Sequence, residues 1–179
     1  MKITETLLDG VIIIQPDIYK DERGYFFETF NKLSFKKYGE KYNFVQDNQS
    51  VSKKGVLRGL HFQRNHPQGK LVRCSKGSVF DVVVDINQKS NNFGKHFSVV
   101  LSEEKNNLLW IPPGYAHGFQ ALSDNACFQY KCTNYYYPED QGGIIWNDND
   151  LDISWPIIEP LVSEKDKLNP SLQEYISLL

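Results

Sequence analysis

Two side chains that can move protons lie in strand-like segments of this chain. His61 belongs to the run 56–63, and a neutral imidazole can accept a proton near neutral pH. Tyr130 belongs to the run 128–132, where alternation gives it apolar neighbours on its own face and so predicts that it points inward. A buried tyrosine more often only packs, and a lone histidine on a strand is more often structural. The residues alone therefore leave both chemical roles open.

A lysine and two aspartates could complete a site for proton transfer. Lys70 follows the turn-like residues 65–69 and opens the next strand-like run. An inward lysine is costly unless an anionic group meets it, and a solvated lysine at a strand end is the commoner alternative. Asp81 could orient a histidine or simply bond a turn. Asp166 ends the sequence 163–166, which has the spacing of a capping box, so the residues alone favour a helix cap.

The run 56–63 carries both His61 and Arg58, but strict alternation puts them on opposite faces of a strand. They can serve one site only if the alternation is broken between them. Gly59 is a plausible position for a β-bulge. We therefore expect an irregular strand at Gly59.

Short runs rich in Val, Ile, Phe and Tyr, separated by turn residues, make up most of the chain and are typical of strands. The runs are 11–14, 25–30, 71–74, 79–86, 97–101, 108–111, 119–122 and 127–133. So many short strands favour a sandwich or a barrel. Because no linker or internal repeat is visible, residues 1–179 are expected to form one domain.

Few helices are expected, and two segments have the start and stop signals of one. The first covers residues 31–38, with Asn31 as its cap and Gly39 as its stop. The second covers residues 170–179, with Asn169 as its cap and Pro170 at the first helical position. The expected apolar face of the second helix contains Leu172, Tyr175, Ile176 and Leu179.

The composition argues against several classes of function. The chain has 179 residues and a net charge of −2, which disfavours wholesale binding of nucleic acid. No apolar run is long enough to cross a bilayer, and residues 1–10 lack the apolar core of a signal peptide. We therefore expect a cytoplasmic protein with no membrane partner. Cys74, Cys127 and Cys132 form no CxxC pair, so neither a zinc site nor a disulfide framework is expected.

Two stretches, residues 58–63 and 112–119, resemble the half-motifs of a cupin barrel whose metal site has been lost. A metal-binding cupin would place a second histidine two residues after His61, and this chain has Gln63 there. His61 is therefore expected to be free for acid–base chemistry instead of holding an ion.

Motifs along nearly the whole chain resemble, in their order, those of the dTDP-4-dehydrorhamnose 3,5-epimerase family. The matching segments are residues 21–24, 26–28, 45–48, 56–63, 68–73, 80–82, 113–119, 130–131, 133–136, 146–148 and 163–166. Each motif is weak alone, but so many in order make a chance similarity implausible.

The resemblance implies an all-β, cupin-type jelly-roll barrel with a few short peripheral helices. It implies a homodimer that uses neither a metal nor a cofactor. It also implies an isomerase that inverts C3 and C5 of dTDP-4-dehydro-6-deoxy-D-glucose, giving dTDP-4-dehydro-L-rhamnose. This reaction is a step of dTDP-rhamnose biosynthesis, which supplies carbohydrates such as lipopolysaccharide.

The resemblance assigns catalytic roles to four residues. Hydrogens beside a ketone are only weakly acidic, so their removal needs a base and stabilisation of the enolate oxygen. His61 matches the base, and Asp166 matches the carboxylate that holds its ring. Tyr130 matches the acid that delivers a proton to the opposite face, since a phenol with a pKa of roughly 10 arrives protonated. Lys70 matches the position that stabilises charge on the C4 oxygen.

Ten further positions are expected to bind the substrate. Arg23 and Arg58 suit the diphosphate, and Tyr136 could stack on thymine. Since the family's early strands cross to the partner subunit, Arg23 and Glu28 are expected to complete the other chain's site. The full set is Arg23, Glu28, Gln46, Asp47, Asn48, Arg58, His117, Tyr136, Gln141 and Lys165.

One departure from the family pattern leaves the substrate open. Many members carry a glutamate where this chain has Gln141, and a neutral amide keeps the hydrogen bond but loses the charge. A 3-epimerase or 3,5-epimerase of a related nucleotide-linked 4-ketosugar is one alternative. A non-catalytic saccharide-binding cupin is another. A metal-dependent cupin oxygenase or isomerase is a third, against which Gln63 argues.

Overall fold

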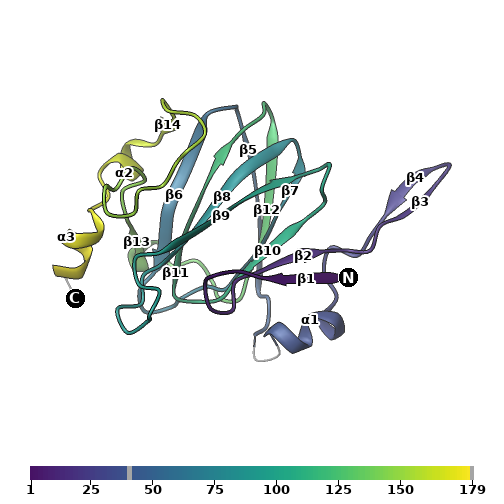
Figure 1. The fold of residues 1–179 in the computed structure, drawn as a ribbon, viewed down its shortest axis with the longest axis horizontal. Coiled ribbons are helices and arrows are strands. Elements are labelled where there is room, and N and C mark those ends of the chain that lie inside the picture. The colour runs from purple at the N-terminus through teal and green to yellow at the C-terminus, as the bar shows by residue number, and fades with distance from the viewer. Residues whose placement is uncertain (40–41, 178–179) are drawn as a thin grey trace.

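The computed structural model describes residues 1–39 and 42–177, and two facing β-sheets dominate it (Figure 1). The first sheet contains, in order, β1 (Lys2–Glu5), β2 (Ile12–Gln15), β10 (Leu108–Ile111), β7 (Lys70–Lys76), β12 (Ala126–Cys132) and β5 (Gln46–Ser52). The second contains, in order, β13 (Gln141–Gly143), β6 (Val56–Gln63), β11 (Tyr115–Ala121), β8 (Ser78–Asp85) and β9 (His96–Ser102). The predicted all-β jelly-roll barrel is confirmed.

Small peripheral elements flank the two sheets. Strand β14 (Leu161–Val162) pairs in parallel with β6. Strands β3 (Tyr19–Asp21) and β4 (Gly24–Phe26) form a hairpin that projects away from the barrel, on the side opposite the C-terminal helices (Figure 1). The helical elements are α1 (Lys32–Gly39), a 3₁₀ turn (Pro138–Asp140), α2 (Glu164–Lys167) and α3 (Leu172–Ser177). No helix within the described ranges is long and apolar enough to span a bilayer.

Most predicted strands are present, with bounds that move by a few residues. The predicted run 25–30 is wrong beyond Phe26, where β4 ends. Strand β5 was not predicted, because Gln46–Ser52 is almost entirely polar and lacks the apolar alternation that marks a strand. Strand β5 pairs with β12, and every second residue of β5 is partly or fully buried. Polar side chains therefore form this wall of the barrel.

The two predicted helices are also present. Asn31 caps α1 as expected, because its side-chain oxygen accepts from the N–H groups of Leu33 and Ser34 at 3.0 and 3.4 Å. The tail helix begins later than predicted, at Leu172, because Ser171 and Glu174 form the capping box in place of Asn169. Leu172 and Tyr175 are buried as predicted, whereas Leu179 lies outside the described residues.

Three apolar clusters hold these layers together. The first fills the space between the sheets and includes Val72, Leu109 and Phe128. The second packs the C-terminal segment on the outside of the second sheet and includes Leu60, Ile144 and Tyr175. The third lies beneath α1, around Trp110. Since the first cluster fills only part of the interior, space remains between the sheets for a site.

Candidate active site

A cavity of about 570 Å³ lies between the two sheets. It is lined by side chains from β6, β7, β11 and β12, and by the segment that contains α2. Eight of the predicted site residues meet in it. They are Arg58, His61, Lys70, His117, Tyr130, Gln141, Lys165 and Asp166.

The irregular strand at Gly59 is what lets Arg58 and His61 share this cavity. Gly59 has a φ of +126°, and the register of β6 against β11 shifts beside it. A Cβ at Gly59 would lie 2.6 Å from the Cα of Gly118, so the two glycines pack backbone against backbone. The predicted break in alternation is therefore confirmed, and it requires glycine because φ is positive and the neighbouring backbone is too close. Ser52 accepts a hydrogen bond from the Nε of Arg58 at 3.3 Å.

His61 and Asp166 form the closest polar contact of the cavity. The Nε2 atom of His61 lies 2.6 Å from Oδ1 of Asp166. The Oδ2 atom of Asp166 accepts the N–H of Gly59 at 3.3 Å. With Nε2 held by the carboxylate, Nδ1 is the ring nitrogen left available to a ligand.

Asp166 is also part of the helix cap that its sequence predicts. Its backbone N–H donates to Oγ of Ser163 at 3.1 Å, while its buried carboxylate faces His61. Burial alone would raise the pKa of Asp166, but the hydrogen bond and charge of His61 and the N–H of Gly59 outweigh it. The pKa therefore lies below its usual value. The cap uses the backbone N–H of Asp166 and the contact with His61 uses its side chain, so the two roles coexist.

Tyr130 and Lys70 lie on the opposite sheet, across the cavity from His61. The ring of Tyr130 packs against Phe128, with ring centroids 5.9 Å apart, and points inward as predicted. Burial raises the pKa of Tyr130, against the opposing charge of Arg58, so its phenol is protonated at neutral pH. Burial lowers the pKa of Lys70, and the nearby Cys132 and Asp81 oppose this effect.

His117 is buried beside Asp81. Its Nε2 atom lies 3.0 Å from both carboxylate oxygens of Asp81. Burial lowers the pKa of His117, although Asp81 opposes this, and the nearby Lys70 and His61 lower it further. The sequence left two roles open for Asp81, and the structure shows it in contact with a histidine, His117.

A second cavity of about 300 Å³ adjoins the first and shares His61, Lys70, Tyr130 and Gln141 with it. Its lining includes three more of the predicted residues, namely Gln46, Asn48 and Tyr136. The Oε1 atom of Gln141 accepts from the hydroxyl of Tyr136 at 2.6 Å and from Nζ of Lys165 at 2.9 Å. The neutral amide of Gln141 thus joins the two cavities through a pair of hydrogen bonds.

Three predicted residues do not line either cavity of this chain. Arg23 lies in the β3–β4 hairpin, its side chain 85% exposed and paired with Asp21. Glu28 accepts a hydrogen bond from Asn31 at 3.0 Å near α1. Asp47 alternates with Gln46 and Asn48 along β5, so it points to the other face of the sheet and pairs with Lys131.

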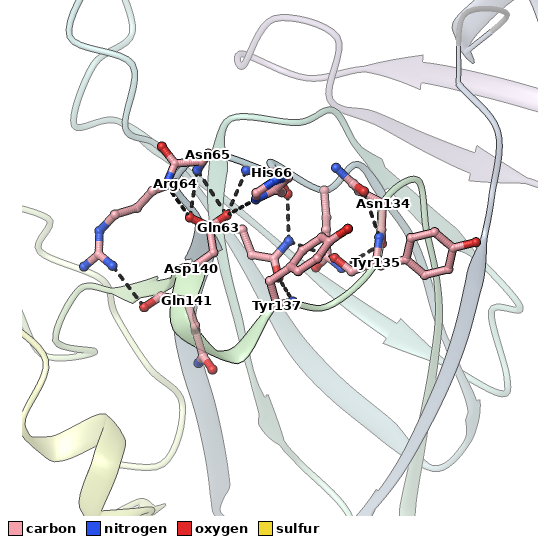
Figure 2. Close-up of polar contacts among 10 residues, drawn as sticks. Gln63, Arg64, Asn65, His66, Asn134, Tyr135, Tyr137, Asp140 and Gln141 are labelled. Carbon is pink, nitrogen blue, oxygen red and sulfur yellow. Dashed lines mark hydrogen bonds and ion pairs between the residues drawn. The ribbon is translucent and has the colours of Figure 1, made fainter.

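Gln63, which stands where a metal-binding half-motif has its second histidine, lies in the lining of the smaller cavity. Its amide makes three hydrogen bonds to the turn and loop beside β6 (Figure 2). Asp140 lies in the same network and was missed, because it acts only through residues far away in the sequence. No group of three or more His, Cys, Asp or Glu side chains suited to a metal ion occurs in the described part of the chain.

The chain is also similar to known proteins over most of its length. A family model described as dTDP-4-dehydrorhamnose 3,5-epimerase matches residues 5–174. A protein of that description from Methanothermobacter thermautotrophicus is 51% identical, over 97% of this chain and 95% of the relative.

Solved structures share the fold as well. A dTDP-6-deoxy-D-glucose-3,5-epimerase from Legionella pneumophila, in complex with dTDP-4-keto-L-rhamnose, superimposes with a TM-score of 0.94 at 47% identity, covering 96% and 93% of the two chains. A 3'-monoepimerase from Streptomyces bikiniensis, in complex with dTDP-quinovose, gives a TM-score of 0.90 at 33% identity, covering 97% and 90%. On its sequence, its jelly-roll barrel and these matches, the chain belongs to the dTDP-4-dehydrorhamnose 3,5-epimerase family.

Proposed function

We propose that this chain inverts C3 and C5 of dTDP-4-dehydro-6-deoxy-D-glucose to give dTDP-4-dehydro-L-rhamnose. The observation that carries the proposal is the His61–Asp166 pair, 2.6 Å apart, facing Tyr130 and Lys70 across one cavity. A base on one wall and an acid on the other are what inversion at carbon requires, because the proton must leave one face and return to the opposite face.

In this scheme His61 removes the proton beside the C4 ketone through Nδ1. The carboxylate of Asp166 holds the ring and stabilises the imidazolium that forms. Lys70 stabilises the negative charge that develops on the C4 oxygen. Because Lys70 is largely buried, little water competes with the C4 oxygen for its N–H donors, and the same burial lowers its pKa. Tyr130 then delivers a proton to the opposite face of the carbon.

The remaining cavity residues serve recognition. Arg58 and Lys165 lie at the cavity wall and suit the diphosphate. His117, held by Asp81, contacts the sugar. The adjoining cavity, lined by Gln46, Asn48 and Tyr136, takes the thymidine end, where the exposed ring of Tyr136 provides a stacking surface.

We also propose that one domain of residues 1–179 acts as a cytoplasmic homodimer, with Arg23 and Glu28 completing the partner's site. The β3–β4 hairpin projects from the barrel and exposes Tyr25 and Phe26 (Figure 1). In addition, Nε and Nη1 of Arg73 are buried without a hydrogen-bond partner among the described residues, on the sheet face opposite the cavity. A second subunit on that face would cover the aromatic rings and supply acceptors to Arg73.

Complementation tests this exchange. Co-expressed His61→Ala and Arg23→Ala chains form heterodimers in which one site carries both changes and the other carries neither. Random pairing then restores roughly a quarter of wild-type activity, although each variant alone is impaired. No gain over the separate variants would show that Arg23 acts within its own chain or not at all.

The reaction itself is tested by product analysis. The purified protein is given dTDP-4-dehydro-6-deoxyglucose, the product is trapped with a 4-ketoreductase, and its configuration is read by NMR. A sugar inverted at C3 and C5 supports the proposal. Inversion at C3 alone would instead support the alternative suggested by the similarity to a 3'-monoepimerase. Binding without turnover would make the chain a saccharide-binding cupin.

A further inference from the structure

Gln63 ties two loops together at the edge of the smaller cavity. It is only 6% exposed, and its Nε2 donates to the carbonyls of His66 and Tyr135 at 2.7 and 3.0 Å. Its Oε1 accepts from the N–H of Tyr137 at 2.7 Å. Figure 2 shows this amide between the turn after β6 and the loop after β12. One side chain therefore satisfies three backbone groups on two segments that are distant in sequence.

Asp140 holds the same two segments together from the other side (Figure 2). Its carboxylate accepts from the backbone N–H groups of Asn65 and His66 at 2.9 and 2.8 Å. It also accepts from the side chains of Asn65, at 2.8 Å, and His66, at 3.1 Å. Burial alone would raise the pKa of Asp140, but these hydrogen bonds outweigh it and the pKa lies below its usual value. The carboxylate is therefore ionised at neutral pH and all of its bonds are charge-assisted.

The loop held in this way, residues 134–141, carries two of the cavity residues. Tyr136 lies between Tyr135 and Tyr137, whose backbone groups Gln63 binds. Gln141 follows Asp140 directly, and its side chain accepts from the hydroxyl of Tyr136 at 2.6 Å. Gln63 is far from Tyr136 in sequence and Asp140 lies four residues after it, and their bonds fix the backbone on both sides of the ring that lines the smaller cavity.

We propose that Gln63 and Asp140 are positioning residues that set the affinity for the nucleoside diphosphate end of the substrate, not the rate of proton transfer. A recognition loop that is ordered before the ligand arrives loses less conformational entropy on binding. The inference rests on the proposed function, because it takes the smaller cavity as the nucleotide end. It also gives a structural reason why glutamine, and not the histidine of a metal-binding half-motif, occupies position 63.

The test compares two buried glutamines. Gln63→Met keeps the length of the side chain and removes its three hydrogen bonds. The matched control is Gln120→Met, since Gln120 is 0% exposed and also holds a distant loop, through Ile157, by bonds of 2.8 and 2.9 Å. Gln120 lines neither cavity. The measurements are thermal unfolding, the Kd for dTDP by calorimetry, and kcat and KM for the 4-ketosugar nucleotide.

We expect both variants to lose stability, and only Gln63→Met to weaken dTDP binding and raise KM, each about tenfold, with kcat within about twofold of wild type. If Gln63→Met does not fold, Asp140→Asn provides the same test, because it keeps one acceptor oxygen and removes the charge.

The outcomes separate this inference from the proposed function. A wild-type protein that neither binds dTDP nor converts the sugar overturns both. An active wild type whose Gln63→Met variant keeps its KM, or loses kcat instead, overturns only the positioning role. Equal rises in KM for Gln63→Met and Gln120→Met would also overturn it, since general loosening of the fold would then explain the effect.

Discussion

Replacing Asp166 by asparagine keeps the shape of the side chain and removes its charge, so it isolates what the carboxylate does for His61. The structure also predicts how the asparagine will orient. The N–H of Gly59 points at Oδ2 of Asp166, at 3.3 Å, and only an oxygen can accept from it. The amide oxygen therefore faces Gly59, and the NH₂ group faces Nε2 of His61, where the carboxylate stood 2.6 Å away.

This orientation lowers the rate of proton removal in two ways. Loss of a hydrogen bond to an ionised group removes about 1.5–3 kcal/mol of stabilisation from the imidazolium, which corresponds to about 10- to 150-fold in rate. In addition, an NH₂ group that donates to Nε2 of His61 forces the proton onto Nδ1, the nitrogen that must act as the base. The same exchange behind the histidine of a serine protease lowers kcat about 10⁴-fold. We therefore expect Asp166→Asn to lose at least about 100-fold in kcat.

The helix cap provides the control, because it uses the backbone N–H of Asp166 and the side chain of Ser163. Ser163→Ala removes the cap at a cost of about 1 kcal/mol in the free energy of unfolding and leaves the carboxylate in place. We expect it to keep kcat within about threefold of wild type. The assay is a reductase-coupled turnover measurement, with urea unfolding of each variant. If Asp166→Asn keeps a kcat within tenfold of wild type, or if Ser163→Ala is equally slow, the charge of Asp166 is not what His61 needs for turnover.

Three further predictions follow from the geometry. Tyr130→Phe keeps the ring and removes the proposed acid, so kcat should fall about 10²- to 10⁴-fold while calorimetry finds unchanged binding of dTDP; unchanged turnover would remove Tyr130 from the mechanism. Gly59→Ala should destabilise the fold far more than Gly24→Ala. Both glycines have φ near +126°, but only at Gly59 would a Cβ clash with backbone, because it would lie 2.6 Å from the Cα of Gly118. Urea unfolding should give a cost of about 1–3 kcal/mol for Gly24→Ala and a larger cost or no folding for Gly59→Ala, and equal costs would contradict the close packing. Since burial lowers the pKa of His117 in the folded state, the unfolded chain binds more protons once the pH falls below about 6.5. The free energy of unfolding should therefore decrease from pH 7 to pH 5, and His117→Gln should flatten this slope in urea titrations; an unchanged slope would assign it to other groups.

The strands that could be predicted from the sequence are those whose apolar residues mark a buried face. Leu108–Ile111 was predicted at its observed bounds because all four residues are apolar and buried. Gln46–Ser52 could not be predicted in this way, because its half-buried face contributes polar groups to the two cavities. The start of α3 was misplaced because the sequence offers two caps close together, and only the structure shows that Ser171 is used.

Site features that depend on neighbouring residues could be predicted, and those that depend on contacts distant in sequence could not. The break at Gly59 could be inferred, because only a local irregularity lets Arg58 and His61 share a face. The contact of His61 with Asp166 joins residues 105 positions apart, and no local pattern points to it. The resemblance to a family supplied that pairing. The roles of Gln63 and Asp140 were not predicted, because each depends on backbone groups of a loop whose shape the sequence does not reveal.

In the proposed reaction, one cavity removes protons from both carbons beside the ketone, and His61 is the base. Exchange of these protons with the solvent can be followed carbon by carbon. The protein is incubated with dTDP-4-dehydro-6-deoxyglucose in deuterated water, and the sugar is examined by NMR. We expect deuterium at both C3 and C5 with the wild-type protein, and none with His61→Ala, which should still bind dTDP. Label at C3 alone, or full label with His61→Ala, would contradict the proposed reaction.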